Sequence, residues 1–251
     1  MWRMKMKRII PSVVALLLSM NPVVLASNSD EEIEVTFTEN EDEVDVTQLT
    51  EYLEPYSIGH GRTPVGDSTQ YPNRVVGLLL SNIDGVLSAC TASLVNSQII
   101  VTASHCLMNK RTLKVVGGWF YPAKNSERGE PYGRVWVKQV VNLKGYARKL
   151  RENDATGAYN FDVALGVLTK PLNIGYLGLG SGGGNLSNGK YLRTIGYHSD
   201  KKKATMWEGY CRIQKKISAM VVEHNCLSAQ HSSGSPLIDD NSTVFAVSTG
   251  S

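Results

Sequence analysis

Three residue types in this sequence could carry nucleophilic chemistry together: a serine, a histidine and an aspartate. Ser233 lies in the run Ser232-Ser233-Gly234-Ser235-Pro236, where small residues permit a tight turn and the proline leads into an apolar strand. A serine hydroxyl is a poor nucleophile unless a base is held beside it. Because a turn rich in serine and glycine is most often an ordinary loop, Ser233 is informative only if the chain also supplies a base and an acid.

His105 and Asp162 are the candidates for this base and this acid. His105 ends the apolar run 99–104 and precedes Cys106, a setting that can hold an imidazole at the end of a strand. Asp162 opens the apolar run 163–165, and a carboxylate that is partly buried there must be paired or hydrogen-bonded. A histidine N–H is a suitable partner that also fixes the tautomer of the ring. Taken singly, His105 could be structural, and Asp162 could cap the start of a strand.

The elements that must position these residues are short strands. Apolar runs of strand length alternate with turns, and helical periodicity is scarce outside Tyr146–Glu152. This pattern indicates an all-β fold, a sandwich or a barrel, in one domain or in two similar halves. The glycine-rich run 180–184 is interpreted as a connection between halves, and Lys201–Lys203 as a solvated hairpin tip. The expected strands are Val75–Leu80, Ala92–Val95, Ile99–Thr102, Leu113–Val116, Tyr132–Val141, Asp162–Leu168, Tyr191–Tyr197, Thr205–Ile213, Ser218–Val222, Pro236–Ile238 and Val244–Ser248.

The first 26 residues of the 251-residue chain have the features of a signal peptide. A basic start is followed by an apolar run that Pro11 and Pro22 interrupt and that is short for a membrane span. Val24 and Ala26 fit the small-residue pattern of a signal-peptidase site, which predicts cleavage after Ala26. The alternative is an uncleaved membrane anchor. Residues 1–26 therefore predict a secreted protein, extracellular or periplasmic, with no membrane attachment after cleavage.

Residues 27–56 form an acidic segment with eleven Asp and Glu and no Lys or Arg. Such a composition is normally solvated and poorly ordered. Four of the 26 basic residues lie in the leader and eleven of the 23 acidic ones in this segment, so residues 57–251 carry a net charge of +10. The opposite charges suggest a propeptide that covers a basic domain and is cleaved near Tyr56 and Ser57; a solubilising tail is the alternative. No platform of Arg and aromatic residues argues for nucleic acid as a partner.

Four cysteines are an even number in a chain that is expected to be exported, which predicts disulfides. Three connectivities are possible. Sequential pairing, Cys90–Cys106 and Cys211–Cys226, closes two short loops and is favoured, with each bridge contributing about 3 kcal/mol by loop entropy. Zinc binding is less favoured, since no CxxC and no pair of histidines at ligand spacing occurs.

Taken in their order along the chain, His105, Asp162 and Ser233 resemble the triad of the chymotrypsin-like serine peptidases. The resemblance covers about Ser57 to Ser251, and the serine motif looks most like that of the bacterial glutamyl-endopeptidase branch. The matching stretches are Cys90–Leu94 and Thr102–Cys106 for the histidine motif with its disulfide, Asp162–Leu165 for the aspartate motif, Ser233–Leu237 for the serine motif, Ile58–Thr63 with Tyr71–Arg74 for the mature N-terminus, and Ile195–Tyr197 with Met206–Gly209 for a hairpin of the second barrel.

The resemblance implies a trypsin-like fold of two six-stranded antiparallel β-barrels with the site in the cleft between them. The domain would span residues 57–251, with a first barrel at about 57–170 and a second at about 185–251. Members of the family continue by a further strand or two and a helix beyond the position of Ser251. We therefore expect the chain to be truncated and the second barrel to be incomplete.

The same resemblance assigns roles to residues. Ser233 would attack the scissile carbonyl, His105 would take its proton and return it to the leaving amine, and Asp162 would orient the imidazole. The backbone N–H groups of His231 and Ser233 would form the oxyanion hole. No metal and no organic cofactor is implied; the expected partners are protein or peptide substrates and the chain's own acidic propeptide, and a monomer is expected. The substrate-binding strand would consist of Ser248, Thr249 and Gly250.

Four positions depart from the family's pattern. The family has glycine where this chain has His231, and the backbone shape of that glycine costs another residue about 1 kcal/mol or more. Ser232 replaces the aspartate that serves trypsin's own activation. Ser248 stands where the glutamyl branch carries a histidine, and Leu227 lies near the base of the specificity pocket, so neither a Glu nor a Lys/Arg preference is predicted. The alternative function is a catalytically impaired homologue that binds proteins or polyanions.

Overall fold

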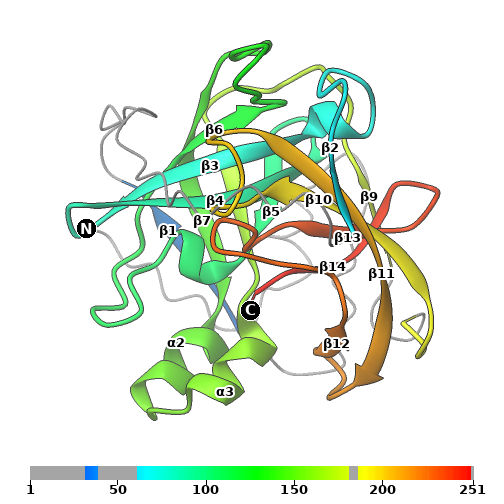
Figure 1. The fold of residues 1–251 in the computed structure, drawn as a ribbon. Coiled ribbons are helices and arrows are strands. Elements are labelled where there is room, and N and C mark those ends of the chain that lie inside the picture. The colour runs from blue at the N-terminus through cyan, green and yellow to red at the C-terminus, as the bar shows by residue number, and fades with distance from the viewer. Residues whose placement is uncertain (1–31, 39–60, 181–185, 250–251) are drawn as a thin grey trace.

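The computed structural model describes residues 32–38, 61–180 and 186–249, and β-strands make up most of the regular structure in these ranges (Figure 1). The strands form two sheets. The predicted signal peptide, the cleavage positions after Ala26 and near Tyr56, most of the acidic segment, most of the glycine-rich run and Gly250 lie outside the described residues. Within those ranges, no helix is long and apolar enough to cross a membrane.

The first sheet closes into a six-stranded antiparallel barrel. Its strands follow the order β7-β6-β3-β4-β5-β8, and β7 also pairs with β8. This barrel confirms the first half of the expected fold. The strands are β3 (Val76–Ile83), β4 (Val86–Asn96), β5 (Ile99–Thr102), β6 (Trp119–Pro122), β7 (Val135–Leu143) and β8 (Ala164–Leu168).

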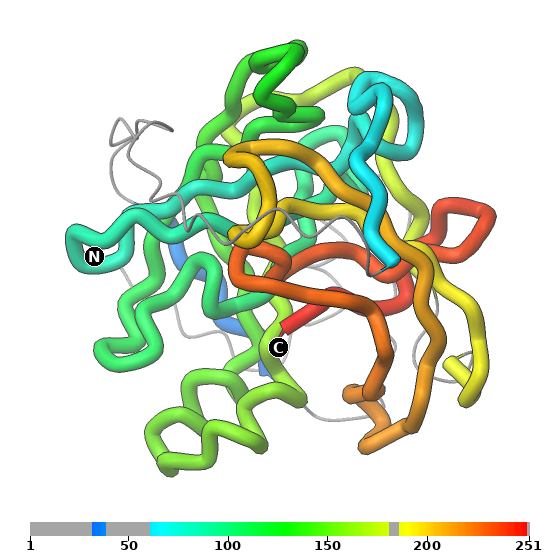
Figure 2. Tube along the Cα trace, viewed as in Figure 1, coloured from blue at the N-terminus to red at the C-terminus, as the bar shows by residue number. Residues whose placement is uncertain are grey.

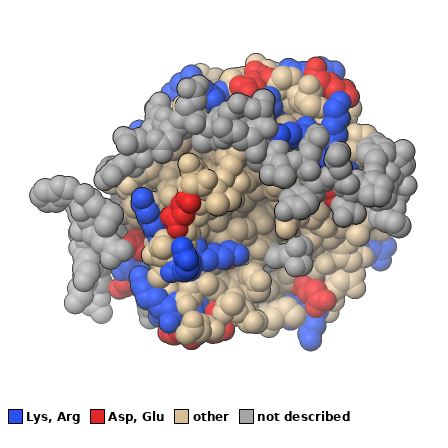
Figure 3. All heavy atoms as spheres, turned by 60° about the vertical axis from the view of Figure 1, so that its left-hand side comes forward, with Lys and Arg blue, Asp and Glu red and all other residues tan. Residues whose placement is uncertain are grey.

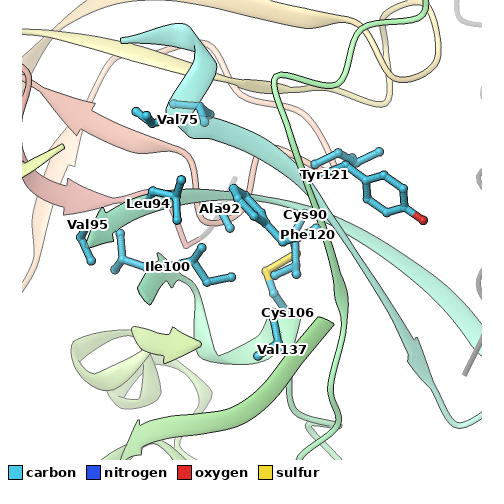
Figure 4. Packing of buried hydrophobic residues seen from close by; sticks show 14 of the residues in the cluster. Val75, Cys90, Ala92, Leu94, Val95, Ile100, Cys106, Phe120, Tyr121 and Val137 are labelled. Atoms are coloured by element: carbon cyan, nitrogen blue, oxygen red, sulfur yellow. A yellow bond between two sulfur atoms is a disulfide. The ribbon is translucent and has the colours of Figure 1, made fainter. Parts of the chain in front are cut away.

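Apolar side chains from these strands fill the barrel. Figure 4 shows Leu94, Ile100, Phe120 and Val137 around the Cys90–Cys106 disulfide, and all four apolar side chains are completely buried. Burying one side chain of this size contributes about 1.5–3 kcal/mol to folding. The barrel is therefore a packed core that can hold residues at its strand ends rigidly.

The second sheet has the strand order β12-β11-β10-β13-β14-β9, and β2 adds to β11. Figure 2 shows the β2 segment beside β11. Every strand pair in this sheet is antiparallel except β14 with β9, which is parallel. The two sheets confirm the all-β fold. The strands are β2 (Arg62–Pro64), β9 (Gly178–Leu179), β10 (Tyr191–Tyr197), β11 (Met206–Lys216), β12 (Val222–His224), β13 (Pro236–Ile238) and β14 (Thr243–Val247).

One more strand lies in the acidic segment, where the composition predicts a solvated chain. β1 (Ile33–Phe37) pairs antiparallel with residues 139–143 of β7 and extends the first sheet to seven strands. The expectation fails here because β-branched and aromatic residues alternate with polar ones in this short stretch, which favours a strand despite the acidic surroundings.

Two short helices separate β7 from β8 and deliver the chain to Asp162. α2 (Lys144–Arg151) corresponds to the helix expected at Tyr146–Glu152, and α3 (Ala155–Ala158) lies beside it at one end of the first sheet (Figure 1). The 3-10 turn η4 (Tyr159–Phe161) then ends directly before Asp162. A small apolar cluster of Met108, Tyr146, Ala147 and Ala158 holds these helices against the barrel.

Two expected strands do not form as predicted. In Leu113–Val116, Leu113 has a φ of 59° and Val115 makes only an isolated bridge. The Asn109 carboxamide accepts two backbone N–H groups just upstream, which favours a turn. In Ser218–Val222 the strand starts only at the last residue, because the Ser218 hydroxyl accepts two backbone N–H groups of a turn.

Candidate active site

His105 and Asp162, the candidate base and acid, contact each other at two points. The ring Nδ1 of His105 lies 2.8 Å from Asp162 Oδ2, and the backbone N–H of His105 donates to Asp162 Oδ1 at 3.0 Å. Asp162 is 2% exposed, so these bonds compensate a carboxylate that has lost its water. A nitrogen that faces a carboxylate carries the proton, which leaves Nε2 as the acceptor. The pair thus holds the tautomer that a general base needs.

Neighbouring contacts fix this pair from both sides. The 3-10 turn η3 (Ser104–Cys106) places His105 one turn after β5, and the Cys90–Cys106 disulfide ties η3 to β4. The Ser104 hydroxyl donates to the carbonyl oxygen of Val163 at 2.9 Å. The residue before the histidine is therefore bonded to the residue after the aspartate.

Ser233 lies in a loop that packs against the same strand end. Its carbonyl oxygen accepts the N–H of Thr91 at 2.8 Å, and Cys106 Sγ lies 3.9 Å from that oxygen. The structure thus brings the backbone of Ser233 beside the turn that carries His105. Within the described residues no hydrogen bond joins the Ser233 hydroxyl to the His105 ring, and catalytic hydrogen bonds often tighten only in the substrate complex.

Gly234 allows this close approach. Its φ is 82°, and a Cβ at this position would overlap the carbonyl oxygen of Thr91 and the hydroxyl of Thr102. No other residue type fits such a backbone without displacing β4 or β5. The glycine after the candidate nucleophile is therefore required by packing.

The carbonyl groups of the loop 230–233 are all hydrogen-bonded. A loop with every carbonyl engaged is held in one backbone conformation. The donors are the Ser199 N–H for Gln230 (2.8 Å), the Thr91 hydroxyl for His231 (3.1 Å), the Ser235 N–H for Ser232 (2.9 Å) and the Thr91 N–H for Ser233 (2.8 Å).

The N–H groups of the loop divide into two sets. Those of Ser232, Gly234 and Ser235 donate to backbone carbonyls at 3.1, 2.6 and 2.9 Å. Those of Gln230, His231 and Ser233 meet no acceptor in the part of the chain that the structure describes. Gln230 is exposed to solvent, whereas His231 and Ser233 are half-buried, so the N–H groups of His231 and Ser233 are suited to bind a developing oxyanion.

His231 accommodates the backbone shape for which the resemblance expects glycine. Its φ is 73°, in the left-handed region, and its side chain is half-buried. A non-glycine residue in this region costs about 1–3 kcal/mol, which the fixed carbonyls on both sides of the residue can offset.

Thr91 is a site residue to which the sequence assigned no role. It is completely buried in β4, and its backbone N–H and hydroxyl hold Ser233 and His231. Its hydroxyl oxygen also accepts the N–H of Tyr197 in β10 at 3.0 Å. Thr91 therefore connects the first barrel, the second sheet and the loop 230–235 that carries Ser233, here called the serine loop. The only signal in the sequence is a hydroxyl residue beside Cys90 in a run of small and apolar residues.

Three ionisable side chains around the site have shifted pKa values. Burial lowers the pKa of His198 to about 3, with the Arg62 charge adding to the effect, and burial also lowers the pKa of His231. Burial, together with the charge of Asp162, raises the pKa of Tyr146 far above its ordinary value. Nδ1 of His198 has no partner within the described ranges. The imidazoles of His198 and His231 are therefore neutral near pH 7.

Lys201 is buried, whereas Lys201–Lys203 is expected to be a solvated tip. The residue is 8% exposed, and its ammonium nitrogen lies 4.9 Å from the centre of the Trp207 ring. An ammonium group over an indole face gains a cation–π attraction that offsets part of its lost hydration. The neighbouring Asp200 is paired with Arg62 of β2 at 3.1 Å.

The expected substrate strand is only partly described. Ser248 is 7% exposed, and its N–H and carbonyl are bonded to Ser235 and Gly234 at 2.9 and 2.6 Å. Its backbone therefore supports the serine loop. Thr249 follows half-buried, and Leu227 is 41% exposed. Neither side chain supplies a charge for selecting a charged substrate residue.

Both favoured disulfides are present, Cys90–Cys106 and Cys211–Cys226, with Cα–Cα distances of 6.0 and 4.7 Å. The first holds η3, and the second joins β11 to the segment that leads to the serine loop. His105 and His224 each lie beside one of these pairs, but sulfur atoms in a disulfide are not thiolate ligands for a metal.

Comparisons with known proteins identify the family and the fold. A family model described as Trypsin matches residues 65–251. A structure of a Glu endopeptidase in complex with MPD is similar at a TM-score of 0.65 and 22% identity, covering 76% of this chain and 86% of that chain. The protease Anisep from Arthrobacter nicotinovorans gives 0.59 and 19%, covering 76% and 86%. The thermostable serine protease AL20 from an extremophilic microorganism gives 0.55 and 18%, covering 69% and 82%. At these identities the structural likeness establishes the fold. No curated protein matches the chain in sequence.

Proposed function

Because this chain belongs to the trypsin family, we propose that it is a secreted serine endopeptidase, made as an inactive precursor, that uses Ser233, His105 and Asp162 as its triad. The observation that carries the proposal is the two-point contact of the Asp162 carboxylate with the ring and backbone of His105. It orients the imidazole and leaves Nε2 able to accept a proton. The packing of the Ser233 loop against η3 supports the same arrangement.

In the proposed acylation, Ser233 Oγ attacks the carbonyl carbon of the scissile bond while His105 Nε2 takes the hydroxyl proton. The carbonyl oxygen becomes an oxyanion, which the N–H groups of His231 and Ser233 stabilise. The imidazolium, stabilised by Asp162, then gives the proton to the leaving nitrogen, so the C–N bond breaks and an ester on Ser233 remains. Water, deprotonated by the same imidazole, hydrolyses this ester.

Energetic magnitudes favour a peptidase over the catalytically impaired homologue. One oxyanion donor contributes about 3 kcal/mol to the stabilisation of the transition state. The left-handed backbone of His231 costs about 1–3 kcal/mol, and the folded loop already contains this cost. Since the His231 N–H has no acceptor within the described residues, no protein hydrogen bond has to break for it to bind an oxyanion.

Export and a precursor form are supported by separate features. Residues 1–26 have the basic start, apolar run and small residues of a signal peptide. Two disulfides fit an oxidising compartment. The acidic segment 27–56 precedes a domain of opposite charge, as expected for a propeptide.

The test is hydrolysis of casein by the processed full-length protein and its variants. Ser233→Ala should lower the rate on the order of 10⁶-fold, as loss of the triad serine does in other serine proteases. Ser235→Ala is the matched control, because Ser235 is buried in the same loop and its hydroxyl has no partner among the described residues. Casein hydrolysis that survives Ser233→Ala would contradict the proposal.

A further inference from the structure

β1 covers an edge of β7 that the barrel itself leaves open. β6 pairs with β7 only at Val135 and Trp136, while β8 lines the other side of β7 as far as Asn142. Residues 138–144 would therefore present a row of unpaired backbone groups on the side of β6. An open edge of this kind is a template for another strand. β1, the blue strand in Figure 1, fills this position.

The pairing extends beyond β1 at both ends. The N–H of Thr38 donates to the carbonyl oxygen of Lys138 at 2.9 Å, and the N–H of Lys144 donates to that of Glu32 at 2.8 Å. The Thr38 hydroxyl also donates to the carbonyl oxygen of Val137 at 2.8 Å. The residues of 32–38 and 138–144 are thus matched one to one in an antiparallel register.

This register decides which amides of the strand face β7. Hydrogen-bonded pairs alternate with non-bonded pairs in an antiparallel ladder. Because the pairs at both ends involve even-numbered residues, the amides of Glu34 and Thr36 face β7, opposite Asn142 and Val140. The amide of Val35 faces away from β7. The hydrogen bonds between this strand and β7 are therefore set by the backbone and do not depend on the acidic side chains.

Charge adds a local contact at one end of the ladder. Glu32 pairs with the ammonium group of Lys144, the first residue of α2. Figure 3 shows Lys and Arg side chains gathered on the face that it brings forward. An exposed pair of this kind contributes little to stability and weakens in salt, so the backbone hydrogen bonds are the main source of affinity.

We propose that the edge of β7, residues 138–144, is a dedicated docking surface for residues 32–38, and that the acidic segment stays bound through this strand after it has been cut from the domain. Strand addition to an open edge is an established mode of peptide recognition, with backbone bonds supplying affinity. The cut rests on the precursor organisation proposed above; the docking does not depend on catalysis.

The docked strand also bears on the helices that precede Asp162. Its Glu32 holds the backbone and the side chain of Lys144 at the start of α2. Two residues later, Tyr146 packs in the apolar cluster that α2 shares with α3, and the charge of Asp162 contributes to raising the pKa of Tyr146. Strand docking therefore stabilises the element that leads to the candidate acid.

The first experiment measures amide hydrogen exchange by NMR in the full precursor and two variants. Thr36→Pro removes an amide that faces β7, whereas Val35→Pro, its matched control, removes one that faces away. The amides of Val140 and Asn142 should be protected in the wild type and in Val35→Pro and should lose protection in Thr36→Pro. Equal protection in the two variants, or unprotected amides in the wild type, would overturn the proposal.

The second experiment needs no destabilising substitution. A protease site inserted between residues 45 and 46 lets the folded precursor be cut, and size-exclusion chromatography follows the two fragments. They should co-elute in low salt and in about 1 M salt, where charges are screened beyond about 3 Å. Separation in high salt alone would show an electrostatic cover instead of a docked strand. Neither readout depends on peptide hydrolysis by this protein itself. Both results can therefore be interpreted even if the peptidase proposal fails.

Discussion

The hydroxyl of Thr91 donates to the carbonyl oxygen of His231 at 3.1 Å, across 140 positions of sequence. The same hydroxyl accepts the N–H of Tyr197, and the backbone N–H of Thr91 donates to Ser233. A strand of the first barrel thereby sets the backbone of the loop that carries the candidate nucleophile. The proposed oxyanion hole therefore depends on contact between the two sheets.

Replacing Thr91 by valine should lower kcat with little change in KM. The change keeps the shape of the side chain but leaves a buried carbonyl at His231 and a buried N–H at Tyr197 without a partner, which costs about 1–3 kcal/mol each. Steady-state kinetics and urea unfolding measure the two effects. Ser93→Ala is the control, because the buried Ser93 hydroxyl in the same strand has no partner among the described residues. Equal effects of the two substitutions would refute the role of Thr91.

Substitutions at His231 should show whether its backbone conformation or its imidazole side chain matters for activity. His231→Gly keeps the left-handed backbone, with a φ of 73° in the parent, and should change kcat/KM by less than about tenfold. His231→Val should lower it much further, because a β-branched residue is strongly disfavoured at positive φ. If glycine raises kcat/KM by orders of magnitude, the oxyanion hole of the native chain is not formed as described.

His198 should make stability depend on pH in one direction. Its pKa is about 3 in the folded protein against an ordinary value of 6.5, so the unfolded chain binds the proton first as the pH falls. The stability that neutral His198 contributes is therefore complete above pH 6.5 and is lost between there and about pH 3, amounting to about 5 kcal/mol. Arg62, Lys201 and His231 lower this pKa further, and Asp200 opposes them.

Urea unfolding at pH 7 and pH 5 tests this prediction. The wild type should lose about 2 kcal/mol more than His198→Gln over this interval, since only the wild type has the buried imidazole. His224→Gln serves as the comparison, because His224 is less buried and its pKa is lowered by burial alone. An identical pH dependence in wild type and His198→Gln would contradict the assignment.

The sequence predicts strands well where an apolar run is bounded by turns on both sides. Ile99–Thr102 forms β5 with these bounds. Strand prediction from the sequence fails where a local polar side chain favours a turn, as Asn109 does before Leu113. It also fails where glycines interrupt the apolar pattern, as Gly117 and Gly118 do before β6. β1 is not predicted because the acidic composition around it outweighs its short strand pattern, and because its partner strand lies about a hundred residues away.

The candidate site likewise contains residues that the sequence predicts and residues that only the structure reveals. Residue types and motif order nominate His105, Asp162 and Ser233, and the structure joins the first two by hydrogen bonds. The role of Thr91 could not be predicted, because it depends on which carbonyls fold back onto β4. Patterns in sequence identify reactive groups, whereas the groups that position them emerge from long-range contacts.

The most direct measurement is covalent labelling of the processed, full-length protein by a fluorophosphonate, with the adduct mapped by mass spectrometry. Only a serine activated by an adjacent base reacts quickly with such a reagent. We expect one adduct, on Ser233, that forms in the wild type and in Ser235→Ala and is lost in His105→Ala. An unlabelled Ser233, or labelling that proceeds unchanged without the imidazole of His105, would contradict the proposed triad.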